Sequence, residues 1–340
     1  MNLSGEIYVQ DRVAQYREIW HTAATSLNAD FLEIAPAFWE VKLNNRKTII
    51  HNYLVGADNP VKLSIAGNKA LCFKLMARAG ITIPPYMVFK VDSVEKIKNF
   101  MARNGQWYVV KPAKNSAAGL GVTTHIRSYG EAVKAAAIAS LYDDEILIEK
   151  LIPGESYRLL FLNGHLIHAV KRAGIRITGD GKTPIKDLIR TNYLGNVHEK
   201  NDISYNKLDQ DPDLVATLQY QKLSLESVIP QGNTVLVKSI DVFKKKYSEV
   251  RTSYSDEVTD LISDSILEEA KKTADLFKFE LLGVDVITLN PAVSLKETGG
   301  VIDEFNTTPG MHHHYNIIEN SGVEPPAGKV LAYLLKKESF

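Results

Sequence analysis

The spacing of apolar residues along the chain predicts short strands alternating with helices. Apolar side chains that recur with a helical period predict helices at 13–27, 64–79, 92–104, 131–141, 211–227 and 259–276. Short runs rich in β-branched, aromatic and other apolar residues predict strands at 31–34, 48–50, 87–89, 107–112, 146–149, 157–162, 166–170, 174–178, 234–237, 283–287 and 301–306. No internal repeat is present. The pattern predicts a protein that mixes helices and strands.

Two turns give local detail to the middle of the chain. Asn163-Gly164 separates two apolar runs, and this dipeptide is the strongest short-range signal for a β-hairpin. The next strand runs into Gly179-Asp180-Gly181-Lys182, which is typical of a tight turn. Lys182 belongs either to a simple hairpin tip or to a site, and the sequence does not decide between them.

Oxygen-bearing side chains interrupt the last two strands. Glu304 and Asn306 are two residues apart, so both leave their strand on the same side. Asp285 is a lone carboxylate in an otherwise apolar run. Three hard oxygen donors on adjacent strands suit Mg²⁺, whose coordination shell is completed by phosphate and water. The alternative for each residue alone is a satisfied polar side chain at a strand end.

A second candidate region lies upstream. The strand at 107–112 carries Lys111 near its end, and small residues follow it at 113–122. Small side chains let backbone N–H groups approach a phosphate, and Lys111 would add a positive charge. A flexible hairpin tip has the same composition, so this loop is weak support by itself. Lys69, on the helix at 64–79, is either a ligand-binding lysine or part of a solvated face.

The composition limits the possible partners. Lys+Arg and Asp+Glu both number 40, so no global charge attracts nucleic acid or an anionic membrane. The one cysteine, Cys72, excludes an intrachain disulfide and fits a reducing compartment. The first residues lack the features of a signal peptide, and no apolar run approaches the ~18 residues that a membrane helix needs. We therefore expect a soluble, cytoplasmic protein that binds neither nucleic acid nor membranes.

Taken together, these features resemble one family. The resemblance covers roughly residues 64–320 and rests on residues 157–160 (YRLL), 179–185 (GDGKTPI), 283–285 (GVD) and 304–311 (EFNTTPGM). Their order and spacing are similar to those of ATP-grasp ligases, in particular cyanophycin synthetase and the ATP-grasp half of bifunctional glutathione synthetases. Residues 1–62 match only as the lobe that usually precedes this fold.

The resemblance implies a fold and a set of residue roles. It implies two α+β lobes that sandwich ATP, at 63–150 and 151–340, behind a small α/β lobe at 1–62. The cofactors would be ATP and Mg²⁺, with Mn²⁺ as an alternative. The implied site residues are Lys69 and Lys111 on the phosphates; Ser116, Gly119 and Gly121 in the phosphate loop; Glu149, Lys150 and Ile152 in the adenine hinge; Glu155 on the ribose; Asp285, Glu304 and Asn306 on the metal; and Arg172 as the catalytic arginine.

The implied reaction is the ADP-forming ligation of a carboxylate to an amine. The carboxylate would be activated as an acyl phosphate, and an amino acid or small peptide would supply the amine. Two alternatives stay open: a kinase or a ligase with another nucleophile, and a binding protein that turns nothing over. The partners would be small molecules, and a homodimer is one option for the assembly.

Two features depart from the family or fall outside it. The region 240–256 is rich in Lys and Ser where relatives have a glycine turn, and 114–121 is rich in Ala. The first departure leaves the substrates unassigned. His312, His313 and His314 fit a zinc site, a substrate pocket or the surface; on an extended segment at most two of them would share a face.

Overall fold

The chain folds into two compact units, and each unit combines segments that are far apart in the sequence. The computed structural model describes residues 3–114, 121–172, 174–194, 208, 212–238, 255–315, 317 and 322–337. Unit 1 comprises Met1–Ile83, Ile152–Arg172 and Tyr254–Phe340, and unit 2 comprises Pro84–Leu151 and Ala173–Ser253. The expected domain boundaries at 62 and 150 stay a prediction.

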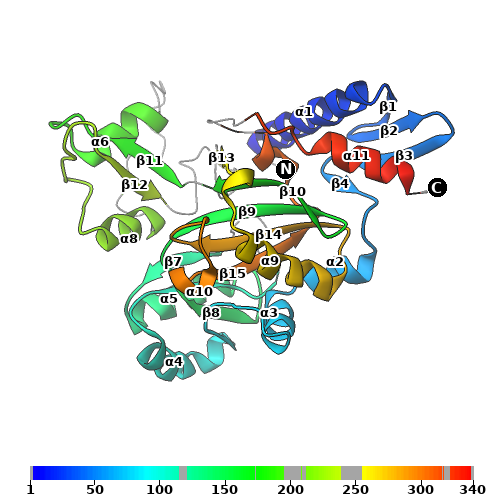
Figure 1. The fold of residues 1–340 in the computed structure, drawn as a ribbon. Coiled ribbons are helices and arrows are strands. Elements are labelled where there is room, and N and C mark those ends of the chain that lie inside the picture. Colours follow the sequence, from blue (N-terminus) through cyan, green and yellow to red (C-terminus); the bar gives the residue numbers. More distant parts are fainter. Residues whose placement is uncertain are drawn as a thin grey trace. The chain divides into compact units, whose positions relative to one another are not determined.

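A five-stranded antiparallel sheet lies at the centre of unit 1 (Figure 1). In spatial order its strands are β13 (Ser255–Glu257), β10 (His165–Arg172), β9 (Glu155–Leu162), β14 (Leu281–Thr288) and β15 (Val301–Thr307). β9 and β10 form the predicted hairpin, and Asn163 and Gly164 have φ of 48° and 77°, as a two-residue hairpin turn of this type requires. β14 and β15 pair with each other, so the two strands predicted to hold the metal are neighbours.

One predicted helix of unit 1 has different boundaries in the structure. The predicted helix at 259–276 is instead a 3₁₀ turn, Thr259–Leu261, followed by α9 (Asp264–Phe277). Ser263 starts α9 because its hydroxyl accepts a hydrogen bond from the Ile266 amide. α9 buries Ile266, Ala270 and Ala274 and packs on β14, while α10 (Leu295–Thr298) and the 3₁₀ turn η6 (Met311–His314) flank β15.

The first and last segments of unit 1 share one core. The strands β1 (Asp30–Ala35), β2 (Phe38–Leu43), β3 (Arg46–His51) and β4 (Leu54–Val55) form an antiparallel sheet in chain order. The helices α1 (Leu3–Ser26) and α11 (Ala327–Lys336) pack on each other, and α11 contacts β3. Trp20, Trp39 and Leu334 are fully buried in this core. β2 was missing from the prediction although its residues alternate between exposed and buried.

The predicted helix at 64–79 is broken in two. α2 (Pro60–Ala66) ends before Gly67, and α3 (Lys69–Arg78) begins again because the Asn68 side chain accepts a hydrogen bond from the Leu71 amide. The apolar period continues through the break, which is why the pattern indicated one helix. Lys69 is consequently the first residue of α3 rather than a residue in the middle of a longer helix.

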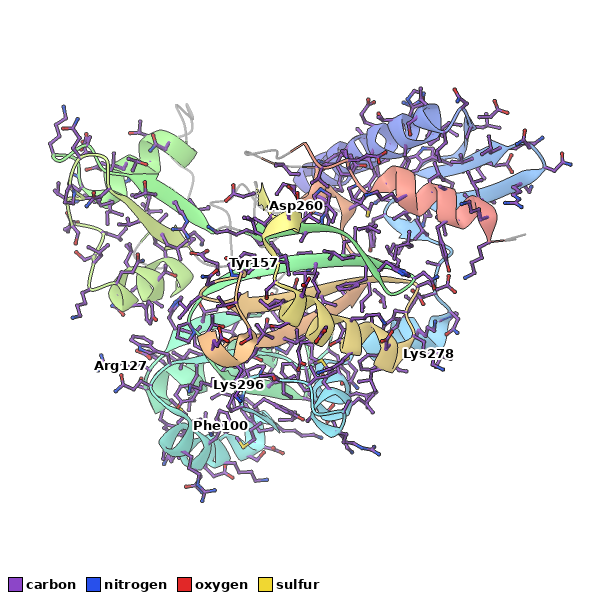
Figure 2. The ribbon with its side chains drawn as sticks, in the orientation of Figure 1. Phe100, Arg127, Tyr157, Asp260, Lys278 and Lys296 are labelled. Carbon is purple, nitrogen blue, oxygen red and sulfur yellow. The ribbon has the colours of Figure 1, made fainter. Side chains whose placement is uncertain are left out.

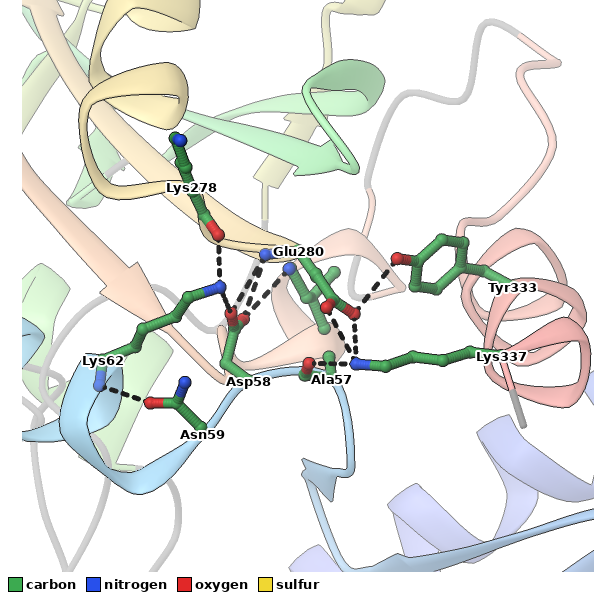
Figure 3. Close-up of polar contacts among 9 residues, drawn as sticks. Ala57, Asp58, Asn59, Lys62, Lys278, Glu280, Tyr333 and Lys337 are labelled. Carbon is green, nitrogen blue, oxygen red and sulfur yellow. Dashed lines mark hydrogen bonds and ion pairs between the residues drawn. The ribbon is translucent and has the colours of Figure 1, made fainter. Parts of the chain in front are cut away.

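A polar network ties these segments to the start of β14 (Figure 3). The Asp58 side chain accepts hydrogen bonds from the backbone amides of Glu280 and Leu281 at 3.1–3.2 Å. Glu280 in turn pairs with Lys337 at the end of α11 and accepts a hydrogen bond from Tyr333. Lys62 bridges Asp58 and the carbonyl of Lys278, the residue after α9 that is labelled in Figure 2. The strand carrying Asp285 is thereby anchored at its beginning.

Unit 2 contains two smaller sheets. A four-stranded sheet has the order β5 (Tyr86–Phe89), β8 (Ile146–Lys150), β6 (Tyr108–Pro112) and β7 (Thr123–Ile126), with α4 (Ile97–Asn104) and α5 (Tyr129–Ala139) contributing to its core. The pair β11 (Ile175–Thr178) and β12 (Thr234–Lys238) has its own core with α6 (Ile185–Ile189) and α8 (Pro212–Tyr220). A π-helical turn, Arg190–Leu194, follows α6.

Two helix predictions in unit 2 need correction. The segment predicted as a helix at 92–104 starts as a 3₁₀ turn, Val91–Lys96, in which Ser93 has non-helical backbone angles (φ −122°, ψ 29°) and bonds through its hydroxyl to the Lys90 backbone. α8 ends at Tyr220 instead of 227. In the described parts of both units, no helix is long and apolar enough to cross a membrane.

Candidate functional site

The central sheet of unit 1 gathers charged side chains on one face. Asp285 on β14 lies opposite Glu304 on β15, and Arg158 on β9 lies opposite Asp285. Arg172 lies two residues beyond Val170, which pairs with Arg158, and Asn306 lies two residues beyond Glu304. Side chains two residues apart on a strand point to the same side, so Arg172 and Asn306 belong to this face as well. The sheet thus brings together the three predicted metal ligands and the predicted catalytic arginine.

Asp285 is the centre of this group. Both its carboxylate oxygens accept hydrogen bonds from Arg158, with Nη2 2.8 Å from Oδ2, and Arg172 Nη1 is 3.2 Å from Oδ2. The side chains of these three residues are at most 6% exposed. The amide nitrogen of Asn306 is 3.4 Å from the same Oδ2. One buried carboxylate therefore orients two guanidinium groups.

Lys69 joins the group from helix α3. Its Nζ is 2.8 Å from Oε1 of Glu304, and the side chains are 15% and 25% exposed. The Asn68 cap fixes where α3 begins and so places Lys69 in its first turn. A predicted phosphate lysine and a predicted metal ligand are therefore direct neighbours within unit 1.

The oxygen donors fit a magnesium-type ion in their chemistry. Asp285 and Glu304 supply carboxylates on adjacent strands, and Asn306 supplies an amide beside Asp285. In the described chain, His, Cys, Asp and Glu side chains form no group of three or more that could hold a metal ion. Two carboxylates and one amide leave room for phosphate oxygens and water, which is how Mg²⁺ is commonly held.

Unit 2 holds the second predicted lysine. Lys111 on β6 forms an ion pair with Glu149 on the neighbouring strand β8, at 2.7 Å, with side chains 6% and 5% exposed. The expected hinge begins here: the Lys150 amide donates to the Pro85 carbonyl and the Leu151 amide to the Trp107 carbonyl, both at 2.9 Å. The end of β8 is thus pinned on both sides.

The remaining predicted nucleotide-binding residues belong to the segment after β6 and to the segment after β8. Gly121 has φ of 73°, and a Cβ there would come within 2.7 Å of Tyr142 and 2.9 Å of Pro112, so only glycine fits. Ile152 is the last residue of the expected hinge, and Glu155 is the first residue of β9, opposite Thr288. Ser116 and Gly119 lie outside the described residues. The roles of all these residues stay predictions.

The three consecutive histidines are buried, so the surface interpretation is wrong. His312, His313 and His314 are 3%, 5% and 0% exposed. His312 Nδ1 is 2.7 Å from the Tyr16 hydroxyl of α1, and His314 Nδ1 is 3.1 Å from Nδ1 of His168 on β10. No metal-binding group of three such ligands forms among the described residues here either.

Burial sets the charge state of this histidine cluster. It lowers the pKa of His168 to about 4, against a partial opposing effect of Glu257. Burial also lowers the pKa of His313 and His314 well below the usual value, and the nearby Arg158 and Arg172 add to this effect. These three histidines are therefore neutral near pH 7.

Sequence reasoning missed His168 and Tyr16 as members of the cluster. A histidine inside the apolar run 166–170 was the available signal for His168. Tyr16 had no comparable signal, since it lies on a helix in the N-terminal segment and meets His312 only in the folded chain.

The chain is similar to two groups of curated ligases. It is 26% identical over 274 residues to cyanophycin synthetase from Synechocystis sp., covering 78% of this chain and 30% of that protein. It is 25% identical over 313 residues to the glutathione biosynthesis bifunctional protein GshAB of Listeria welshimeri, covering 91% of this chain and 39% of that protein. The chain therefore spans only about a third of the length of the curated relatives it matches. No family model matches it.

A solved structure decides the fold. The bifunctional glutathione synthetase from Pasteurella multocida matches 91% of this chain and 41% of its own, with a TM-score of 0.53 and 18% identity. The chain has an ATP-grasp fold. The predicted resemblance and the predicted fold class are confirmed. At this identity the structural likeness concerns the fold, and the chemistry of this ATP-grasp protein has to be argued from its own residues.

Proposed function

We propose that this ATP-grasp protein is an ADP-forming ligase that activates a carboxylate as an acyl phosphate and joins it to an amine. The main support is the arrangement around Asp285 and Glu304: two guanidinium groups and three oxygen donors share one sheet face, and Lys69 of helix α3 pairs with Glu304. Positive groups and a metal site side by side are what phosphoryl transfer requires, because its catalysis is mostly positioning and charge neutralisation. The names of the curated relatives agree with this chemistry.

Each residue then has a defined task. In unit 1, Lys69 would bind phosphate oxygens, and Glu155 would accept hydrogen bonds from the ribose hydroxyls. Asp285 holds the guanidinium group of Arg172 in place. Arg172 would neutralise the charge that grows on the transferring phosphoryl group. In unit 2, Lys111 would contact phosphate, and the backbone from Glu149 to Leu151 would meet the adenine edge because it is held by neighbouring strands.

The divalent ion would be held by Asp285, Glu304 and Asn306. Bound there, Mg²⁺ or Mn²⁺ would neutralise phosphate charge on ATP and so favour departure of ADP. Asn306 would turn its amide oxygen toward the ion.

The substrates are proposed only as classes. An amino acid or short peptide would supply the amine, and a small molecule the carboxylate, as the names of the relatives suggest. Residues 240–254, where the sequence departs from those relatives, lie outside the described residues, so neither cyanophycin nor glutathione is assigned. Cys72 is a buried free thiol, which supports the proposal of a reducing, cytoplasmic setting.

A substrate screen tests this function. Pairs of amino acids and short peptides are incubated with ATP and Mg²⁺, phosphate release is measured, and products are identified by mass spectrometry. We expect ADP, phosphate and an amide whose formation needs both substrates, and no turnover by Glu304→Gln. AMP with pyrophosphate would contradict the proposal, and a phosphorylated product that forms without any amine and does not react with hydroxylamine would indicate the kinase alternative.

A further inference from the structure

Arg158 reaches Asp285 on the adjacent strand β14 by lying over Gly283 of the same strand. Its side chain lies over Gly283, where a Cβ atom would be only 2.8 Å from Arg158 Cδ and 3.0 Å from Pro309 Cβ. Gly283 has no positive φ, so its small size matters for this passage rather than for the backbone conformation. In this position Nε and Nη2 of Arg158 meet the two carboxylate oxygens of Asp285.

Each of the two candidate carboxylate ligands of the metal is already paired with a positively charged side chain. Asp285 is paired with Arg158 and Arg172, and Glu304 is paired with Lys69. The Asp285 side chain is 1% exposed, so water screens these charges weakly. A bare divalent ion would have to enter against two guanidinium groups and compete for carboxylate oxygens that are already engaged. The phosphates of a nucleotide bring the negative charge that would offset this repulsion.

We propose that Arg158 is a specificity-determining residue that excludes free divalent cations from the metal site, so that the ion enters together with the nucleotide. This inference rests on the proposed function for the identity of the site. Arg158 occupies Asp285 until phosphate oxygens arrive, and the guanidinium group then turns toward the phosphates. The side chain thereby couples the binding of metal to the binding of nucleotide.

Manganese titrations followed by electron paramagnetic resonance test this role, because the signal of free Mn²⁺ falls as the ion binds. The wild-type protein, Arg158→Gln and Arg17→Gln are compared, each without nucleotide and with ADP. Arg17 is a matched control because its side chain is 51% exposed in a surface pair with Glu33. Without nucleotide we expect Arg158→Gln to bind Mn²⁺ about tenfold or more tightly than wild type, since one buried positive charge is gone. With ADP the difference should shrink, and Arg17→Gln should match wild type throughout.

A second variant tests the role of Arg158 without removing its charge. Gly283→Ala keeps the arginine but forces its side chain to shift, so Mn²⁺ binding without nucleotide should also increase, by less than in Arg158→Gln. Thermal unfolding confirms that each variant is folded. Wild type binding Mn²⁺ alone as tightly as a folded Arg158→Gln would overturn the proposal. Absence of any ADP binding by calorimetry would overturn the proposed function instead, while the nucleotide-free comparison would still decide the role of Arg158.

Discussion

The ammonium group of Lys69 lies 2.8 Å from a carboxylate oxygen of Glu304, although the two residues belong to a helix near the start of the chain and a strand near its end. The pair places a candidate phosphate ligand against a candidate metal ligand. Because both side chains are partly exposed, the pair itself should add little to stability, about 0–1 kcal/mol. We therefore expect the Lys69–Glu304 pair to matter for the binding of nucleotide and metal rather than for stability.

For Lys69→Met we expect weaker nucleotide binding with almost unchanged stability. Losing one charged contact to phosphate should lower the affinity for ADP about tenfold to a hundredfold. Calorimetry with ADP and Mg²⁺ measures this, with thermal unfolding in parallel. Lys74→Met is the control, since Lys74 is an exposed lysine on the same helix. Equal ADP affinities of the two variants would show that Lys69 pairs with Glu304 without binding the nucleotide.

The two candidate metal carboxylates should differ when neutralised. Glu304→Gln and Asp285→Asn are both expected to abolish phosphate release. Asp285→Asn should also cost roughly 3–5 kcal/mol of unfolding free energy, because it leaves two buried guanidinium groups without their shared carboxylate. Glu304→Gln should cost about 1 kcal/mol or less, given its exposure. Chemical denaturation and a phosphate assay decide this, and near wild-type turnover by either variant would remove it from the metal site.

In unit 2, stability and binding can be separated at the Lys111–Glu149 pair. Lys111→Met alone should weaken ADP binding and also destabilise the protein, because Glu149 would keep its buried charge without this partner. Adding Glu149→Gln should restore much of the stability and little of the ADP affinity. Denaturation curves and calorimetry on both single variants and the double variant give the coupling energy. Full recovery of affinity in the double variant would mean that Lys111 acts only through the fold.

The sequence predicted the face of the site better than its contacts. Strand geometry alone placed Glu304 and Asn306 on one side, and the structure shows Asp285 opposite Glu304 on the same side. Pattern reasoning could not join Arg158 to Asp285, because that contact depends on the order β9-β14 and on the space above Gly283. Strand order is a tertiary property that alternation of residues does not contain.

Helix boundaries failed for a related reason. The apolar period runs through Gly67-Asn68 and through Ile262-Ser263, so periodicity predicted continuous helices. In the structure, Asn68 and Ser263 each end one segment and cap the next with a side-chain hydrogen bond. Capping energies of about 1 kcal/mol are small, but they decide where a helix starts when packing allows either choice. The contact of Tyr16 with His312 has no local signal at all.

Acid should destabilise the protein through the buried histidines. The folded-state pKa of His168 is lowered to about 4, and burial lowers the pKa values of His313 and His314 well below 6.5. Unfolding therefore takes up protons below pH 6.5, and the stability present above that pH is lost as the pH falls. For three histidines the slope reaches about 4 kcal/mol per pH unit at most. His168 contributes down to about pH 4.

Urea denaturation between pH 7.5 and about 4.5 measures this slope. His168→Gln should flatten it by about one proton, because one titrating group is removed. His165→Gln should leave it unchanged, since His165 is an exposed histidine on the same strand. A stability that is independent of pH across this range would contradict the burial of neutral histidines.

Arg172 provides the most direct test of the reaction itself. A carboxylate does not react with amines until one of its oxygens becomes a good leaving group, and transfer of phosphate from ATP achieves this. If an acyl phosphate forms, hydroxylamine should trap it as a hydroxamate when the acceptor amine is omitted. Negative charge grows on the transferring phosphoryl oxygens in the transition state, so Arg172 should stabilise the transition state more than it stabilises bound ATP. Arg172→Lys should therefore lower kcat about a hundredfold, with a smaller change in KM for ATP. Lysine keeps the charge near Asp285, which limits the loss of stability. Hydroxamate formation, measured in wild type and variant by colorimetry, should fall in the same proportion as kcat, whereas a variant altered only in KM for ATP would assign Arg172 to ground-state binding.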